Sequence, residues 1–284
     1  MTSGLDPVAE RATSRTAKAA GVTVHYHEAG QGDPVVLLHS FGPRPGMTAW
    51  LSFHRILDAV AGRYRCLAVD LPNFGRTGPV VFSEPVHAMM ARTVVALLDE
   101  LGIGPVPVVG TSVGATTAIQ LALDHPGRVT RLVLGSCHAS TGGDPYLLSP
   151  SPTEATRRLL ELAAEPGPEP TRRALAALVY DEAAADEALV DYVTAVAAQA
   201  GPHAEALRTS RNVPHSNLAE LARIEVPALI IHGKHDRMVP LEQALMLLAY
   251  LPAADLVVLN RCGHWPPFER PAAYARCVLS FLGR

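Results

Sequence analysis

From residue 21 onward, short apolar runs rich in β-branched residues alternate with longer segments of helical periodicity. The runs are VTVHYHEA, PVVLLH, RCLAVD, VPVVG, VTRLVLGS, VPALIIHG and DLVVLN. Strands that alternate with helices in this way build a mostly parallel sheet, and the helices then cover both of its faces. We therefore expect an α/β fold with a mostly parallel, twisted sheet. The predicted helices span residues 47–60, 85–101, 112–124, 241–251 and 270–282.

The alternation breaks between residues 140 and 215, where the chain is rich in Ala, Glu and Pro and has helical patterns without a convincing strand. Their apolar periodicity indicates helices that pack on a surface, which a flexible linker would not show. We predict a helical lid over residues 140–215, inserted after the run VTRLVLGS, where a fold of this kind carries its lid after its sixth strand. The insertion divides the core domain into residues 21–139 and 216–284. Residues 1–20 mix charged residues with Ser, Thr and Ala, and we expect a flexible N-terminal tail there.

Composition limits the kinds of partner that the chain can have. With 24 basic and 27 acidic residues, the net charge of -3 offers no basic excess for nucleic acid or an anionic membrane surface. The first twenty residues lack the apolar stretch of a secretory signal, and no run of about eighteen apolar residues could cross a bilayer. We expect a cytoplasmic protein that acts on a small molecule, and the sequence leaves open whether it forms a homodimer.

The four cysteines are scattered along the chain, at Cys66, Cys137, Cys262 and Cys277. They form neither a CxxC pair nor the compact framework of a disulfide-rich protein. His232 and His235 flank a glycine, but further ligands at suitable spacing are missing from the sequence around them. We therefore expect neither a metal nor a cofactor.

The segment Gly110-Thr111-Ser112-Val113-Gly114 lies between the run VPVVG and a predicted helix. Gly-x-Ser-x-Gly at a strand-to-helix junction makes a sharp turn that leaves the serine hydroxyl exposed above the sheet. The amides at the start of the helix are unpaired and the helix dipole is positive there, which favours an anion that develops beside the serine. We interpret Ser112 as a nucleophile. The alternative is an ordinary helix-capping serine in a glycine-rich turn.

Asp236 follows the run VPALIIHG, and His264 follows DLVVLN. Both residues come just past the carboxyl ends of predicted strands, where ligands bind in open α/β sheets. The chain order serine, acid, histidine is that of the α/β-hydrolase triad, and it differs from the orders in chymotrypsin and subtilisin. We predict that His264 is the general base and that Asp236 orients its imidazole.

The run PVVLLH ends at His39, and Ser40, Phe41 and Gly42 follow it. Acyl transfer requires donors aimed at the oxygen that becomes negative. We predict that the backbone N–H groups of Phe41 and Val113 form this oxyanion hole. The candidate substrate-binding residues follow strand ends or belong to the lid: Ser40, Gly42, His138, Tyr146, Tyr192, Val239 and Trp265.

Four segments resemble the α/β-hydrolase superfamily and, within it, the meta-cleavage-product hydrolases, which split carbon–carbon bonds in ring-fission dienoates. The matching segments are His39-Ser40-Phe41-Gly42-Pro43 with Trp50 after it, Asp70-Leu71-Pro72-Asn73-Phe74-Gly75-Arg76, His232-Gly233-Lys234-His235-Asp236-Arg237-Met238-Val239-Pro240 and Arg261-Cys262-Gly263-His264-Trp265. The resemblance implies an α/β-hydrolase fold and a cofactor-free serine hydrolase. Its substrate would be a small, largely apolar ester, lactone or vinylogous carbon–carbon bond.

The chain departs from the subfamily pattern at three places. The serine is preceded by Thr111 where the subfamily usually has Asn, and the oxyanion loop reads His39-Ser40 where His-Gly is usual. The subfamily also carries a lid arginine that binds the dienoate carboxylate, but the matching residues 188–194 contain no arginine. A non-hydrolytic catalyst of the same fold (a lyase, cyclase or perhydrolase) and a ligand-binding receptor with a retained triad therefore remain alternatives.

Overall fold

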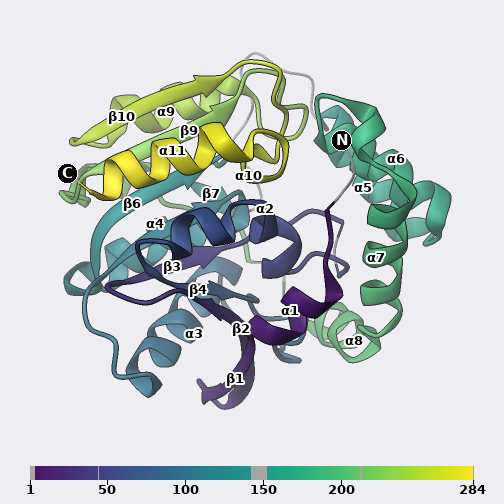
Figure 1. The fold of residues 1–284 in the computed structure, drawn as a ribbon, viewed down its shortest axis with the longest axis horizontal. Helices are drawn as coiled ribbons and strands as arrows, with labels where there is room; N and C mark the ends of the chain where they lie inside the picture. Colours follow the sequence, from purple (N-terminus) through teal and green to yellow (C-terminus); the bar gives the residue numbers. More distant parts are fainter. Residues whose placement is uncertain (1–3, 44, 142–151, 212, 284) are drawn as a thin grey trace.

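The computed structural model describes residues 4–43, 45–141, 152–211 and 213–283, and in this part of the chain eight strands form one sheet with the order β1-β2-β4-β3-β5-β6-β9-β10 (Figure 1). The six strands from β4 to β10 in this order are parallel, and β2 and β1 extend the sheet in antiparallel fashion. Their bounds are β1 Ser14–Ala19, β2 Val22–Ala29, β3 Pro34–Leu38, β4 Arg65–Val69, β5 Val106–Thr111, β6 Val129–Gly135, β9 Ala228–Gly233 and β10 Ala254–Leu259. The predicted α/β class and the mostly parallel sheet are confirmed.

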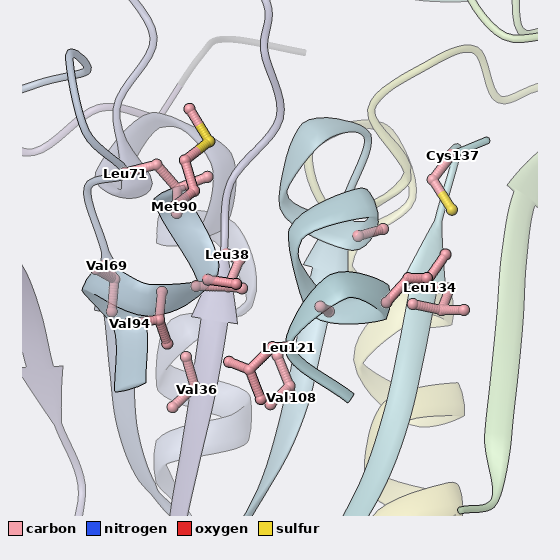
Figure 2. Close-up of a cluster of buried hydrophobic side chains, with 14 of the residues drawn as sticks. Val36, Leu38, Val69, Leu71, Met90, Val94, Val108, Leu121, Leu134 and Cys137 are labelled. Carbon is pink, nitrogen blue, oxygen red and sulfur yellow. The ribbon is translucent and has the colours of Figure 1, made fainter. Parts of the chain in front are cut away.

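Helices cover both faces of the sheet. On one face α2 (Ala49–Ala61) and α11 (Pro271–Leu282) pack on alternate strand residues such as Val35 and Leu37, and Figure 1 shows these two helices in front of the sheet. On the other face α3 (Val86–Glu100), α4 (Val113–Asp124) and α9 (Leu241–Tyr250) pack on the intervening residues. Figure 2 shows part of this second layer, in which Val36, Leu38, Met90 and Val94 meet. The strands are therefore apolar on both sides, as parallel strands between two helical layers must be.

The N-terminal region differs from the prediction. Residues 7–13 form the helix α1 (Pro7–Thr13), which Asp6 caps through the amide of Val8, and residues 14–19 form the edge strand β1. All six residues of β1 pair with β2, from Ser14 opposite His27 to Ala19 opposite Val22. The predicted flexible tail over residues 1–20 is therefore wrong for these residues. An edge strand needs little apolar sequence because solvent covers much of it, and its half-exposed pattern concealed β1.

In the described residues between β6 and β9, four α-helices form a layer on the right of Figure 1, beside the sheet. They are α5 (Glu154–Ala164), α6 (Pro168–Leu178), α7 (Glu187–Ala198) and α8 (Gly201–Thr209). Two short strands, β7 (Ser140–Thr141) and β8 (His215–Ser216), pair antiparallel where the insertion leaves and rejoins the core. The insertion thus has the helical content that the sequence predicted. No helix in the described ranges has both the length and the apolar character needed to cross a membrane.

Candidate active site

Ser112 stands at the turn between β5 and α4 with a left-handed backbone, at φ 51° and ψ -121°. Both glycines of the motif are required by close approach of the backbone. A Cβ at Gly110 would lie 2.5 Å from the backbone of Gly114, and a Cβ at Gly114 would lie 2.2 Å from the carbonyl oxygen of Leu38. Larger residues would push the elbow off the sheet. The glycines therefore allow Ser112 to be lifted above the carboxyl edge.

The helix α4 begins directly after the serine. The amides of Ala115 and Thr116 donate to the carbonyl oxygen of Ser112, at 2.9 and 3.0 Å. Val113 and Gly114 precede these bonds, so their amides are among the first of the helix, which have no acceptor within it. The N–H of Val113, one of the two predicted oxyanion donors, lies at the positive end of α4.

Asp236 and His264 form a buried pair. Nδ1 of His264 lies 2.9 Å from Oδ2 of Asp236, and their side chains are 1% and 0% exposed. Oδ1 of Asp236 also accepts from the amides of Met238 and Val239, at 2.8 and 2.9 Å. Burial alone would raise the pKa of Asp236, but His264 and the hydrogen bonds to the carboxylate outweigh it and hold this pKa below its usual value. Asp236 is thus a carboxylate that fixes the Nδ1–H tautomer of His264 and leaves Nε2 able to accept a proton.

Ser112, Asp236 and His264 follow β5, β9 and β10, whose carboxyl ends share one edge of the sheet. Among the described residues, the structure records a hydrogen bond from His264 to Asp236 but none from Ser112 to His264. A bond between nucleophile and base is often long in a site without substrate, and it tightens in the productive complex. The assignment of Ser112 and His264 to one reaction therefore stays a prediction.

The loop that carries His264 is held by Glu269, a residue that the sequence analysis did not identify. The carboxylate of Glu269 accepts from the amides of Gly263 and Trp265, at 2.9 and 3.1 Å, and from that of Tyr180 in the insertion, at 2.7 Å. The amide between them, that of His264, donates to the carbonyl oxygen of Leu178 at 2.7 Å. Burial raises the pKa of Glu269. No sequence signal marks this role, because the third amide comes from a segment remote in the sequence.

Arg237, next to Asp236, ties the acid loop to the same segment of the insertion. One of its guanidinium nitrogens, Nη2, donates to the carbonyl oxygens of Ala176 and Val179, at 2.6 and 2.8 Å. The other, Nη1, forms ion pairs with Glu182 and Glu154. The acid loop and the histidine loop are therefore both fastened to residues 176–182, where α6 ends.

The predicted oxyanion loop is fixed from below by His39, which is fully buried. Nε2 of His39 accepts from the amide of Leu71 at 2.9 Å, so Nδ1 carries the proton and donates to the carbonyl oxygen of Ser40 at 2.7 Å. Burial lowers the pKa of His39, which keeps this imidazole neutral. The orientation of the Ser40 peptide, and with it that of the Phe41 N–H, thus depends on His39, to which the sequence analysis assigned no role of its own.

Three of the predicted substrate-binding residues lie around this loop. A Cβ at Gly42 would lie 3.2 Å from the indole ring of Trp265, so the two residues are neighbours. The hydroxyl of Ser40 and Nε1 of Trp265 are buried and have no hydrogen-bond partner among the described residues. Buried polar groups normally have partners, so these two are exceptions, and their assignment to the substrate site stays a prediction.

The other predicted substrate-binding residues have different surroundings. Tyr192 was expected in the substrate pocket, but its hydroxyl bonds with Thr48 and Glu10, at 3.0 and 3.1 Å, because α7 places it against α1 and the start of α2. Val239 is buried, and its backbone bonds with Asp236 and with His232. His138 is half-buried beside α4, where its carbonyl oxygen accepts from Thr116. Tyr146 lies outside the described residues.

No group of three or more His, Cys, Asp or Glu side chains in the described ranges is arranged to hold a metal ion. The cysteines are free thiols, and burial raises the pKa values of Cys66, Cys137 and Cys262. A raised pKa makes a thiol a poor nucleophile and a poor metal ligand at neutral pH. The reactive groups at the carboxyl edge are therefore the serine, the histidine and the carboxylates.

Comparison with known proteins identifies the family. Residues 33–271 match the model of the alpha/beta hydrolase fold family. The chain is 37% identical to the 2-hydroxy-6-oxononadienedioate/2-hydroxy-6-oxononatrienedioate hydrolase of Burkholderia vietnamiensis, covering 92% of this chain and 91% of that relative. It is 35% identical to the enzyme of the same name from Cupriavidus pinatubonensis over the full length of both chains. The meta-cleavage product hydrolase CumD from Pseudomonas fluorescens IP01 superposes with a TM-score of 0.79 at 26% identity, over 95% of this chain and 97% of that one. The chain therefore belongs to the α/β-hydrolase fold family and is a hydrolase that groups with the meta-cleavage-product enzymes.

Proposed function

We propose that the protein is a cofactor-free serine hydrolase in which Ser112 attacks a substrate carbonyl carbon. His264 takes the proton of the serine hydroxyl, and Asp236 holds the imidazole in the accepting tautomer. The N–H groups of Phe41 and Val113 stabilise the oxyanion, and water then releases the acyl group. The observation that carries this proposal is the strained Ser112 elbow, at the same sheet edge as the buried Asp236–His264 pair.

For the substrate we propose a ring-fission dienoate with a 2-hydroxy-6-oxo pattern, because relatives that match the chain over at least 90% of its length carry that activity in their names. Cleavage beside the 6-carbonyl needs a leaving carbon that can hold an electron pair. Ketonisation of the 2-hydroxy dienoate leaves one carbon–carbon double bond, which conjugates the leaving carbon with the 2-oxo group. The electron pair that the cleavage leaves on this carbon is therefore delocalised. Serine attack on the 6-carbonyl thus uses the same elbow and oxyanion donors as ester hydrolysis.

A specific observation favours a second candidate, hydrolysis of a neutral ester or lactone. Residues 188–194 contain no arginine, and Tyr192 in that stretch bonds with Thr48 and Glu10. A substrate carboxylate buried without a cation is costly. Arginines outside that stretch include Arg157, which is exposed, Arg158, which pairs with Glu161, and Arg44, which lies outside the described residues.

We further propose that helices α5–α8 act as a lid over the carboxyl edge, since Arg237, Glu269 and His264 all bond with its residues 176–182. We expect the reaction to take place in the cytoplasm, a reducing compartment that suits four free thiols.

The test is a parallel assay of the purified protein against ring-fission dienoates, with one and with two carboxylates, and against aryl esters and lactones. Ser112→Ala should abolish turnover of every substrate that the wild type accepts, whereas Ser280→Ala, on the exposed side of α11, should not. Dienoate cleavage with kcat/KM well above that for esters supports carbon–carbon hydrolysis. Ester turnover alone supports the second candidate, and near-native turnover by Ser112→Ala would refute the serine mechanism.

A further inference from the structure

A second Ser–His–Asp arrangement lies at the other end of the sheet, outside the proposed active site. The hydroxyl of Ser14 lies 2.8 Å from Nε2 of His25, and Nδ1 of His25 lies 2.7 Å from Oδ2 of Asp70. Ser14 begins the edge strand β1, His25 is in β2, and Asp70 follows β4. These three strands are neighbours in the sheet, so the arrangement depends on the N-terminal segment that forms β1.

Asp70 has the surroundings of an orienting carboxylate. It is 1% exposed, and it accepts from the amides of Ala49 and Arg76, at 2.7 and 3.1 Å, as well as from His25. Burial alone would raise its pKa, but the bonds and charges around it, those of His25 foremost, hold this pKa below its usual value. Because Asp70 only accepts, Nδ1 of His25 carries the proton, and Nε2 accepts the proton of the Ser14 hydroxyl. This is the protonation pattern that a serine nucleophile requires.

A cavity lies beside His25 and Asp70. The residues that line this cavity of about 220 Å³ include His25, Asp70, Thr48, Arg76 and Tyr192. Ser14 does not line the cavity, but its side chain is only partly buried. A cavity of this size is smaller than the 300–1,000 Å³ of most ligand pockets, so it suits a reagent of a few heavy atoms.

The neighbouring pair Thr13 and His27 provides an internal comparison. The hydroxyl of Thr13 lies 2.9 Å from Nδ1 of His27, whose ring meets that of His25 edge-on. No carboxylate bonds with His27 among the described residues, and burial lowers its pKa to about 4. Such an imidazole is a weak base. Of these two described hydroxyl–histidine pairs, the Ser14–His25 pair has a carboxylate behind its histidine and the Thr13–His27 pair does not.

We propose that Ser14 is a second nucleophile, which accepts acyl or phosphonyl groups from small activated donors independently of Ser112. With an activated acetyl ester, a bond forms between Oγ of Ser14 and the acyl carbon, and the bond from that carbon to the aryloxy oxygen breaks. The proton of the hydroxyl passes to Nε2 of His25, and the aryloxide leaves. Attack by water, with His25 again as the base, would return Ser14 and release acetate.

The reactivity should be lower than that of Ser112. The amide of Ser14 donates to the carbonyl oxygen of Arg11 as the cap of α1, so it cannot hold an oxyanion. Loss of one oxyanion donor costs about 10²–10³ in rate in serine hydrolases. We therefore expect acylation of Ser14 to be about 10²–10³ slower than that of Ser112, and to be visible only when Ser112 is removed.

The experiment uses full-length Ser112→Ala, treated with a small alkyl fluorophosphonate and, separately, with p-nitrophenyl acetate. Intact mass and peptide mass spectrometry then locate the adduct. We expect one added group on Ser14, its loss in Ser112→Ala/Ser14→Ala, and its loss in Ser112→Ala/His25→Gln. Ser14→Ala alone should leave turnover by Ser112 unchanged, which separates this proposal from the one above.

Three results would overturn the proposal: an unlabelled Ser14 after an exposure about 10³-fold longer than the one that labels wild-type Ser112 completely, equal labelling of Ser14 and Thr13, or full labelling of Ser14 in the His25→Gln variant. The last two would show a hydroxyl that reacts without a base. If His25→Gln does not fold, the comparison of Ser112→Ala with its Ser14→Ala double variant still decides the site.

Discussion

Ser112 has a backbone conformation that an ordinary residue avoids. At φ 51° and ψ -121° a side chain with a Cβ is strained, and strain of this kind costs about 1–3 kcal/mol. The turn nevertheless holds it, because Gly110 and Gly114 allow the chain to pass within contact distance of itself and of β3. An ordinary helix cap does not require a strained backbone, so the strain at Ser112 supports its interpretation as a nucleophile.

This strain can be measured by comparing two variants of Ser112. Ser112→Gly removes the Cβ and the strain, whereas Ser112→Ala keeps the Cβ. After the entropy cost of glycine in the unfolded chain is subtracted, we expect Ser112→Gly to unfold with a free energy about 1 kcal/mol higher than Ser112→Ala. Urea denaturation of both variants at pH 7 measures the difference. A Gly variant that is less stable than the Ala variant would show that the elbow is not strained.

The sequence was informative at the residue level wherever chemistry depends on the position of a residue along a strand. Ser112, Asp236 and His264 could be assigned because each follows a recognisable apolar run, and the structure places all three past strand ends. The direction of a long side chain could not be read in the same way. Tyr192 bonds with Glu10 and Thr48, two residues far away in the sequence, so its partners depend on how α7 packs.

At the scale of elements, the loop between β10 and α10 (Pro266–Glu269) is held to the insertion by Glu269. Three backbone amides converge on its carboxylate, two from the histidine loop and one from the insertion. A carboxylate can accept all three bonds, whereas an amide group of the same shape has one oxygen and presents N–H groups to the other donors. The position of His264 thus depends on the charge of Glu269 as well as on its size.

We expect Glu269→Gln to lower kcat about 10–100-fold with little change in KM, because a displacement of a catalytic group by about 1 Å can cost 10²-fold in rate. Steady-state kinetics on the best substrate checks this, with circular dichroism to confirm the folded fraction. The matched control is Glu161→Gln, an exposed residue of α5, which should behave as the wild type. Unchanged kcat, or a loss explained by unfolding alone, would show that Glu269 does not position His264.

Elements were predictable from sequence where two helical layers bury a strand on both faces, since an apolar run then stands out. The five core helices start and end within two residues of their predicted bounds for this reason. The same reasoning missed α1 and β1. Their sequence is polar because β1 lies at the edge of the sheet, and its pairing with β2 is a backbone property that side-chain patterns do not reveal.

For the molecule as a whole, the buried histidines make stability depend on pH. Burial lowers the pKa of His27 and of His87 to about 4, and it lowers the pKa values of His39 and His232 as well. In the unfolded chain each of them would titrate near 6.5. Between about pH 6.5 and 4 the unfolded chain therefore binds protons that the folded chain does not, and the free energy of unfolding falls as the pH falls. Glu10 and Glu269, whose pKa values burial raises, contribute in the opposite direction, but they are two groups against four.

The contribution of one histidine can be isolated at His27, which is 1% exposed. Its lowered pKa predicts a loss of about 1.4 kcal/mol for each pH unit below 6.5, or about 2 kcal/mol between pH 6.5 and pH 5. Urea unfolding of the wild type and of His27→Gln at both pH values measures this difference. The variant should lose about 2 kcal/mol less on acidification, whatever its stability at neutral pH, whereas His235→Gln, at an exposed position, should keep the wild-type dependence. An equal pH dependence in wild type and His27→Gln would mean that His27 takes up its proton without leaving the folded state, and the burial of this imidazole would then not limit stability in acid.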